Sequence, residues 1–288
     1  MRKRLLSVLS AMVLTVGITV SVVPAVEVEA SSAITVDCDN VIRGVTHCAS
    51  GSLYGVTESI PGNISDLVAP LNPHVFTNPA RAGAGCQQPA GAAIEAAKRL
   101  SGTSGKVMIR LADICPGWPY AYPGTERWLE QVESVIQDKK ASGVNNFYGY
   151  EIWNEPVYTW VEENGSFNDM WKQTYDLIRE KDPGAKIIGP SDGYYNHDRM
   201  YSFLQFCKEN NCVPDIVCWH ELIGSAPGSF GDDFAATMAD LRKIEAELGI
   251  GELPVSINEY CDGEHEKEGC PGTSACFIAK FERHKVDS

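Results

Sequence analysis

The chain has little positive charge and lacks the short motifs of several common function classes. It carries 24 Lys and Arg against 38 Asp and Glu, a net charge of −14 over 288 residues. Nucleic acids and anionic membrane surfaces bind proteins through basic patches, so this balance argues against both as partners. A neutral or cationic substrate is easier to accommodate.

Signatures of nucleotide and metal sites are also missing. No GxGxxG or GxxxxGK[ST] follows any of the early strand-like runs, so the nucleotide-binding folds lose their usual support. His220 and Glu221 begin a pattern like the zinc-binding HExxH, but Gly224 stands where the second His is required. We therefore expect no metal and no cofactor.

The ten cysteines contain no CxxC pair in the C-terminal half, which argues against a zinc ribbon. In an exported protein they predict disulfide bonds. Local bridges between Cys207 and Cys212, and among Cys261, Cys270 and Cys276, are the main interpretation, with free thiols as the alternative. The pairing of the other five stays open: Cys38, Cys48, Cys86, Cys115 and Cys218.

The N-terminus resembles an export signal. Three basic residues at positions 2–4 precede an apolar run over 5–26, and residues 28–30 end on small side chains that a signal peptidase reads. We predict a signal peptide over residues 1–30 and a secreted, extracellular protein over 31–288 that has no contact with the membrane after cleavage. An uncleaved anchor is the alternative, because about 20 apolar residues can span a bilayer.

The rest of the chain alternates short strand-like runs with longer helical stretches, and it contains no low-complexity tract or linker. The expected strands cover 41–47, 74–78, 106–111, 147–153, 186–189, 215–220 and 254–258. The expected helices cover 64–71, 90–100, 125–142, 168–182, 199–209, 232–248 and 275–284. This rhythm predicts the α/β class with a parallel sheet, and seven strands favour a (β/α)8 TIM barrel over an open sheet. The chain ends where an eighth strand should begin, so we expect a truncated barrel whose first and seventh strands are not paired.

The run YGYEIWNEP, residues 148–156, places two acids in an apolar strand, where a charge is costly unless it is paired or used. Side chains alternate along a strand, so Glu151 and Glu155 share one face, with Glu155 at the carboxyl end. Catalytic groups of barrels lie at that end. We expect Glu155 to reach a ligand and Glu151 to pair inside the barrel with Arg43 or Arg110.

A second acid, Glu259, ends the strand PVSINEY at residues 254–260. Two carboxylates about 5 Å apart suit a nucleophile and a general acid/base on either side of a glycosidic bond. Asn-Glu-Pro alone could equally be a loop; the second acid, three βα units later, favours the catalytic interpretation.

Both motifs resemble those of the retaining glycoside hydrolases of clan A. Trp153-Asn154-Glu155-Pro156 is similar to their acid/base signature on strand four, and Ile257-Asn258-Glu259-Tyr260 to their strand-seven nucleophile. The whole Trp-Asn-Glu-Pro motif is most similar to that of family 39, which includes β-xylosidases, with relatives in families 5, 30 and 51.

The resemblance implies a role for each matching residue. Glu155 is the expected acid/base and Glu259 the nucleophile. Asn154 is expected to bind the sugar hydroxyl beside the anomeric carbon, and Arg81 to orient the nucleophile, unless it is a surface arginine. His220 stands near the nucleophile, where the clan often has His or Tyr.

Aromatic residues follow the third strand in the loop CPGWPYAYPG. Trp118, Tyr120 and Tyr122 could stack on sugar rings there, and Trp153 and Trp219 are alternatives nearer the acids. Packing in the loop or core is an equal alternative for any single ring. As a group they favour an oligo- or polysaccharide over a small charged substrate.

The sequence thus predicts a secreted retaining β-glycosidase that hydrolyses O-glycosidic bonds of a plant or microbial polysaccharide by double displacement. The alternative is a non-catalytic carbohydrate-binding barrel, inactive through loss of its eighth unit. Two opposed acids favour the enzyme, because a binding module does not need them.

Overall fold

The computed structural model describes residues 37–41, 43–223, 232–262 and 271–288. It divides the chain into two compact units, Met1–Gly44 and Val45–Ser288. The expected signal peptide over 1–30 lies outside the described residues, and so does Cys270. The signal peptide and any disulfide bond of Cys270 therefore stay predictions. Within the described ranges, no helix is long and apolar enough to cross a membrane.

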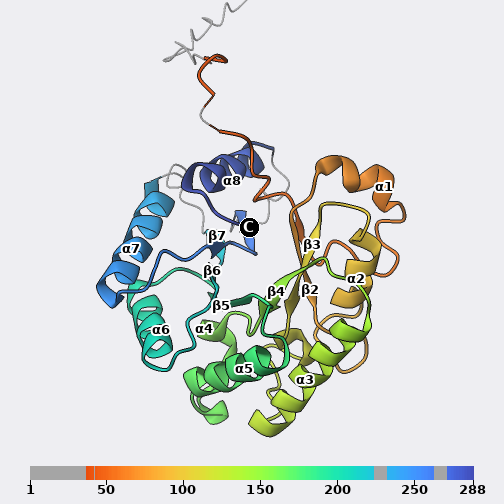
Figure 1. The fold of residues 1–288 in the computed structure, drawn as a ribbon, viewed down its shortest axis with the longest axis vertical. Coiled ribbons are helices and arrows are strands. Elements are labelled where there is room, and N and C mark those ends of the chain that lie inside the picture. The colour runs from red at the N-terminus through yellow and green to blue at the C-terminus, as the bar shows by residue number, and fades with distance from the viewer. Residues whose placement is uncertain (1–36, 42, 224–231, 263–270) are drawn as a thin grey trace, which may run out of the picture. The chain divides into compact units, whose positions relative to one another are not determined.

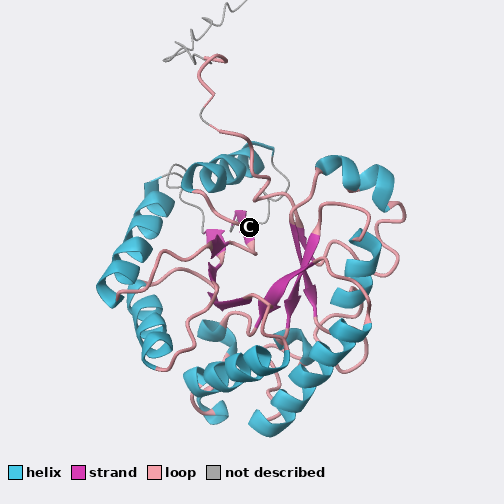
Figure 2. Ribbon diagram, in the orientation of Figure 1, coloured by secondary structure: helices cyan, strands magenta, loops and turns pink. Residues whose placement is uncertain are grey.

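The second unit is built on a curled sheet of seven parallel strands in the order β1-β2-β3-β4-β5-β6-β8 (Figures 1 and 2). The strands are β1 (Ser52–Leu53), β2 (Val75–Pro79), β3 (Lys106–Arg110), β4 (Phe147–Glu151), β5 (Ile187–Asp192), β6 (Ile216–Trp219) and β8 (Val255–Ser256). Strand order follows chain order, as in a barrel. The protein is therefore a (β/α)8-type barrel with seven of the strands present.

Helices lie outside the strands, as Figure 2 shows. They are α1 (Ile64–Leu67), α2 (Ala93–Leu100), α3 (Thr125–Ala141), α4 (Pro156–Thr159), α5 (Phe167–Lys181), α6 (His197–Glu209), α7 (Asp232–Leu248) and α8 (Pro271–His284), with 3-10 turns η1 (Ala69–Leu71), η2 (Ala112–Ile114) and η3 (Glu162–Asn164). In α2, the positions i, i+3, i+4 and i+7 are the fully buried Ala93, Ala96, Ala97 and Leu100. This apolar face packs on the sheet, as amphipathic helices do.

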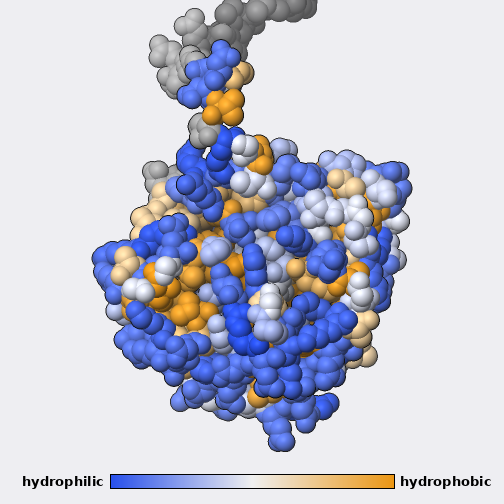
Figure 3. All heavy atoms as spheres, viewed as in Figure 1, coloured by the Kyte–Doolittle hydropathy of each residue, from blue (hydrophilic) through white to orange (hydrophobic). Residues whose placement is uncertain are grey.

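Alternation along β3 separates two parts of the core. Val107 and Ile109 belong to the large cluster shared with the helices, whereas Met108 belongs to a small second cluster with Tyr148 and Cys218. Arg110 shares the parity of Met108 and therefore points with it into the barrel. The face of the unit seen in Figure 3 is largely hydrophilic, with a few apolar patches.

The first strand lies later in the chain than expected. Residues 43–47 form no strand, and Val45 is 69% exposed. Instead Ser52 and Leu53 pair in parallel with Phe76 and Thr77 of β2. The β-branched run at 41–47 has the composition of a strand, but the side chains described at 41 and 43–47 are not buried, so the prediction of a strand there was wrong.

The sheet is open between β1 and β8, as predicted. Among the described residues, β1 pairs with β2 and β8 with β6, and the two edges are not joined. After α8 the chain returns to β8: the N–H of Asp287 donates to Val255 O at 2.8 Å, and the N–H of Ile257 donates to Ser288 O at 2.6 Å. These bonds place 286–288 beside β8, where an eighth strand would start.

Candidate active site

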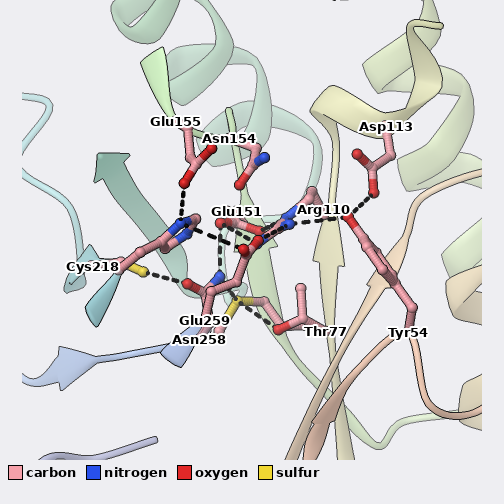
Figure 4. Close-up of polar contacts among 12 residues, drawn as sticks. Tyr54, Thr77, Arg110, Asp113, Glu151, Asn154, Glu155, Cys218, Asn258 and Glu259 are labelled. Atoms are coloured by element: carbon pink, nitrogen blue, oxygen red, sulfur yellow. Dashed lines mark hydrogen bonds and ion pairs between the residues drawn. The ribbon is translucent and has the colours of Figure 1, made fainter. Parts of the chain in front are cut away.

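Three side chains meet at the carboxyl ends of β4, β6 and β8: Glu155, His220 and Glu259. Figure 4 labels the two acids. One side-chain nitrogen or oxygen from each lies within 4.8 Å of the others. Beyond this point, β6 and β8 continue as a separate parallel pair, β7 (Glu221–Ile223) and β9 (Tyr260–Asp262). His220 and Glu259 thus lie at the junction of two ladders, which fixes both from either side.

Glu155 adopts an uncommon backbone conformation. Its φ of 49° and ψ of 55° lie in the left-handed region, which a non-glycine residue rarely occupies. The conformation is held by a bond from its N–H to Ser191 O at 2.8 Å and by the Thr159 hydroxyl, which donates to its carbonyl at 3.0 Å. Such local strain is typical of functional positions. The side chain is 8% exposed, and its Oε1 lies 2.8 Å from Nδ1 of His220.

Glu259 is bound by a cation. Arg110 donates to its Oε1 at 2.5 Å, and its Oε2 lies 3.7 Å from Nδ1 of His220. Burial raises the pKa of Glu259, but the charges of Arg110 and His220 outweigh burial and hold this pKa below its usual range. Glu259 is therefore an anion at neutral pH.

Glu151 lies deeper and is structural, as predicted. It is fully buried and forms a forked ion pair with Arg110, from Nε at 2.5 Å and from Nη2 at 3.2 Å. The Asn258 amide donates to the same carboxylate at 2.7 Å. Of the two expected partners, Arg110 is the one that pairs with Glu151. One buried guanidinium thus joins Glu151 to Glu259.

The prediction that Arg81 orients the nucleophile was wrong. β2 ends at Pro79, and the Arg81 guanidinium binds Ser134 at 2.9 Å and Asp138 at 2.5 Å on α3, outside the barrel. It is 41% exposed. Instead Arg110, at the end of β3, binds the carboxylate of Glu259. Its place in a strand was visible in the sequence, but only the fold shows that one cation serves both acids.

A further acid was missed in the sequence. Asp113, fully buried in η2, accepts hydrogen bonds from the hydroxyls of Tyr54 at 2.7 Å and Tyr120 at 2.9 Å. Burial raises the pKa of Asp113. Arg110 donates to the Tyr54 hydroxyl at 3.0 Å, and the Asn154 amide donates to the Tyr120 hydroxyl at 3.1 Å. Through these two hydroxyls Asp113 is linked to Arg110 and to Asn154. Its position just past strand three was the available signal.

Two buried polar atoms at the site have no protein partner. Asn154 Oδ1 and His220 Nε2 make no hydrogen bond within the part of the chain that the structure describes. Buried polar atoms are normally paired, so such atoms at a site suit the hydroxyls of a ligand. Asn154 lies beside Glu155 in Figure 4.

The aromatic predictions divide by burial. Trp219 is fully buried and donates to Glu221 at 2.8 Å, so it cannot stack on a sugar, and that prediction was wrong. Trp153 and Tyr120 are buried as well. Trp118, by contrast, is 53% exposed and packs edge-on against Tyr120 at 5.6 Å. Its ring is accessible to a ligand.

The spacing of Glu155, His220 and Glu259 would also suit a metal ion. Arg110, however, already places a positive charge 2.5 Å from an oxygen of Glu259. A second cation would be repelled by this guanidinium. The donor set therefore suits proton transfer better than metal binding.

Residues 125–280 match the family model described as glycosyl hydrolases family 39. The match covers more than half of the chain. The chain belongs to glycosyl hydrolase family 39. The two opposed acids had predicted a glycoside hydrolase family.

Two curated proteins resemble part of the chain. The chain is 23% identical over 295 residues to a 3-O-beta-L-arabinopyranosyl-alpha-L-arabinofuranosidase of Bifidobacterium pseudocatenulatum, covering 83% of this chain and 29% of that protein. It is 26% identical over 145 residues to a 3-O-alpha-D-galactosyl-alpha-L-arabinofuranosidase of Bifidobacterium longum subsp. longum, covering 48% and 12%. The family 39 chain thus spans less than a third of either protein.

Solved structures agree on the fold. N2152 from Neocallimastix frontalis is 54% identical with a TM-score of 0.82, over 88% of this chain and 62% of that one. A psychrophilic family 10 endo-beta-1,4-xylanase has a TM-score of 0.55 at 14% identity, over 85% of this chain and 87% of that one. At that identity the likeness concerns the barrel alone.

Proposed function

We propose that this protein is a secreted retaining glycosidase that hydrolyses O-glycosidic bonds of plant or microbial polysaccharide, with Glu155 as general acid/base and Glu259 as nucleophile. The observation that carries the proposal is the separation of the two side chains, whose oxygens lie within 4.8 Å. Retaining glycosidases hold their carboxyl groups about 5 to 5.5 Å apart, whereas inverting enzymes leave room for a water between them.

In the first step, Oε2 of Glu259 attacks the anomeric carbon, because Oε1 is engaged by Arg110. The bond to the leaving oxygen breaks, and that oxygen takes a proton from Glu155. The product is an ester between the sugar and Glu259. In the second step, Glu155 accepts a proton from water, the water oxygen attacks the anomeric carbon, and the ester bond breaks to restore Glu259.

The surrounding residues bind and orient the sugar. Asn154 Oδ1 and His220 Nε2 are free to bond sugar hydroxyls. The exposed face of Trp118 is available to a sugar ring further out. Export rests on the basic and apolar N-terminal pattern of residues 1–30. The named activities of the relatives add α-L-arabinofuranosides to the β-glycosides as substrates to be tried.

Two variants test the roles. Glu259→Ala is expected to abolish turnover of every substrate. Glu155→Ala should slow substrates with poor leaving groups by about 100-fold to 10,000-fold and spare those with good leaving groups, which need little proton assistance. The measurement is kcat/KM on a series of aryl xylosides and arabinofuranosides.

Glu162→Ala, an exposed acid on η3, is the matched control and should keep full activity. Equal losses for Glu155→Ala on activated and unactivated substrates would remove Glu155 from the acid/base role. No turnover by the unmodified protein, with the sugar still bound, would favour a carbohydrate-binding barrel.

A further inference from the structure

Two exposed tyrosines lie beside Glu155. Tyr158 is on α4, three residues after Glu155, and Tyr194 follows β5 by two residues. They are 53% and 42% exposed, whereas Trp153 and Tyr120 near the acids are buried. Their ring centroids lie 6.0 Å apart with the planes at 46°. The pair forms two adjacent apolar facets open to solvent.

Gly193 connects this pair to the acid. A Cβ on Gly193 would lie 2.4 Å from the Tyr158 ring and 2.9 Å from Oε1 of Glu155. Real Cβ atoms do not approach other atoms so closely, so the glycine permits the ring, the backbone and the carboxylate to pack together. The Tyr158 ring therefore lies beside the carboxylate of Glu155.

Asp192 anchors the backbone beside Tyr158. Its Oδ1 accepts a bond at 3.2 Å from the N–H of Val157, the residue before Tyr158. Arg199 binds the same carboxylate twice, at 3.1 and 2.8 Å. The Asp192 carbonyl accepts a bond at 2.8 Å from the N–H of His220. Asp192 thus ties the start of α4, which carries Tyr158, to His220 of the site, and such preorganisation lowers the entropy lost when a ligand is bound.

We propose that Tyr158 and Tyr194 form the binding site for the leaving-group sugar. The inference rests on the proposed roles of Glu155 and Glu259. The proton of Glu155 goes to the oxygen that joins the two sugars, and Glu259 attacks the sugar that stays. The leaving sugar must therefore lie next to Glu155, which is where the Tyr158 ring and its neighbour Tyr194 lie.

Aromatic faces suit the apolar C–H surfaces of a sugar ring, and exposed rings next to a catalytic group are typical of ligand contacts. The natural substrate therefore joins the cleaved sugar to a second sugar, which these rings bind. A compact leaving group would make no use of them.

The test compares two substrates with the same cleaved sugar. Xylobiose and arabinobiose carry a leaving sugar, whereas xylosyl fluoride and arabinofuranosyl fluoride carry a single atom. Tyr158→Ala and Tyr194→Ala should each lower kcat/KM for the disaccharide by about tenfold and leave the fluoride unchanged. Tyr158→Phe keeps the ring and should keep the activity.

Tyr175→Ala, a partly exposed tyrosine on α5, is the control and should change neither substrate. Equal losses on fluoride and disaccharide, or no loss on either, would overturn the inference. If the unmodified protein hydrolyses neither substrate, the proposed function fails, and binding then decides this inference. Calorimetric titration of Glu259→Ala with the disaccharides should show affinity that Tyr158→Ala removes, and unchanged affinity would contradict the site.

Discussion

Arg110 sets the charge balance of the site at the scale of single residues. It is 1% exposed and binds two carboxylates, Glu151 beneath it and Glu259 at the site. A buried carboxylate is costly without a partner. The same cation thus stabilises Glu151 as part of the fold and lowers the pKa of Glu259, which keeps it ionised for the attack that we propose.

The pH dependence follows from Glu259. In the proposed mechanism Glu259 attacks as an anion, and its pKa lies below its usual range because the charges of Arg110 and His220 outweigh burial. As pH falls, the ionised form is lost only below the ordinary glutamate value of about 4.3. A pH profile of kcat/KM should therefore keep its acidic limb below that value. A nucleophile limb at or above it would show that Glu259 is not stabilised in this way.

The same shift affects stability, and its sign is fixed. A carboxyl group whose pKa is depressed by folding contributes stability above its unfolded pKa, and that contribution is lost as pH falls through the folded pKa. The contribution of Glu259 should thus be complete at neutral pH.

Glu151→Ala is expected to destabilise the fold more than Glu155→Ala. Removing Glu151 leaves Arg110 without its forked partner in the barrel, and breaking a buried pair costs about 3 to 5 kcal/mol. The measurement is the free energy of unfolding in urea for both variants. Equal losses, or a larger loss for Glu155→Ala, would refute the structural role of Glu151.

For single residues, the sequence predicted correctly the positions of side chains that depend only on where a strand ends and which way its residues alternate. Glu155 and Glu259 end strands of recognisable composition, and alternation placed Glu151 inside. Arg81 was misassigned because proximity to a strand end does not say which way a loop turns. Tyr158 and Tyr194 were missed because they lie in short segments after the strands, the one-turn helix α4 and the loop after β5, which have no periodicity to detect.

At the scale of elements, the short segments after the strands position the chemistry. α4 has four residues and no helical period to detect, yet it holds Glu155 in its left-handed conformation. β7 and β9 are three residues each, and the N–H of Glu221 donates to Glu259 O at 3.0 Å. The long helices were predicted well because α3, α5 and α7 repeat apolar residues over several turns.

The expected disulfide would join Cys207, in the last turn of α6, to Cys212 just beyond that helix. The structure contains two thiols there and no bond between them, so the bridge stays a prediction. Burial raises the pKa of Cys207, and a hydrogen bond from Cys207 lowers that of Cys212. The thiolate is the reactive form of cysteine, so a lowered pKa at one of two neighbouring cysteines favours oxidation of the pair to a disulfide.

We expect Cys207 and Cys212 to be joined in protein purified under oxidising conditions, with a gain of about 2 kcal/mol in the free energy of unfolding. Mass spectrometry with and without reduction measures the bond. Cys207→Ser is the control, because it should leave the rest of the thiol content unchanged. Two alkylatable thiols at these positions in the oxidised protein would refute the bridge.

At the scale of the whole molecule, the curled sheet brings together residues that are 104 positions apart, Glu155 and Glu259. A cavity of about 380 Å³ lies at the open edge, lined by residues of β1 and β8 and by Glu259 itself. The sequence predicted this opening from the count of strands. It did not predict how residues 286–288 bind β8, because three residues have no pattern of their own.

The stereochemistry of hydrolysis tests the central claim most directly. Proton NMR of the reaction, recorded before the product sugar mutarotates, reports the configuration of the first product. Two side chains whose oxygens lie within 4.8 Å predict that the anomeric configuration of the substrate is retained. A first product of inverted configuration would contradict the assignment of Glu259 as nucleophile and Glu155 as acid/base.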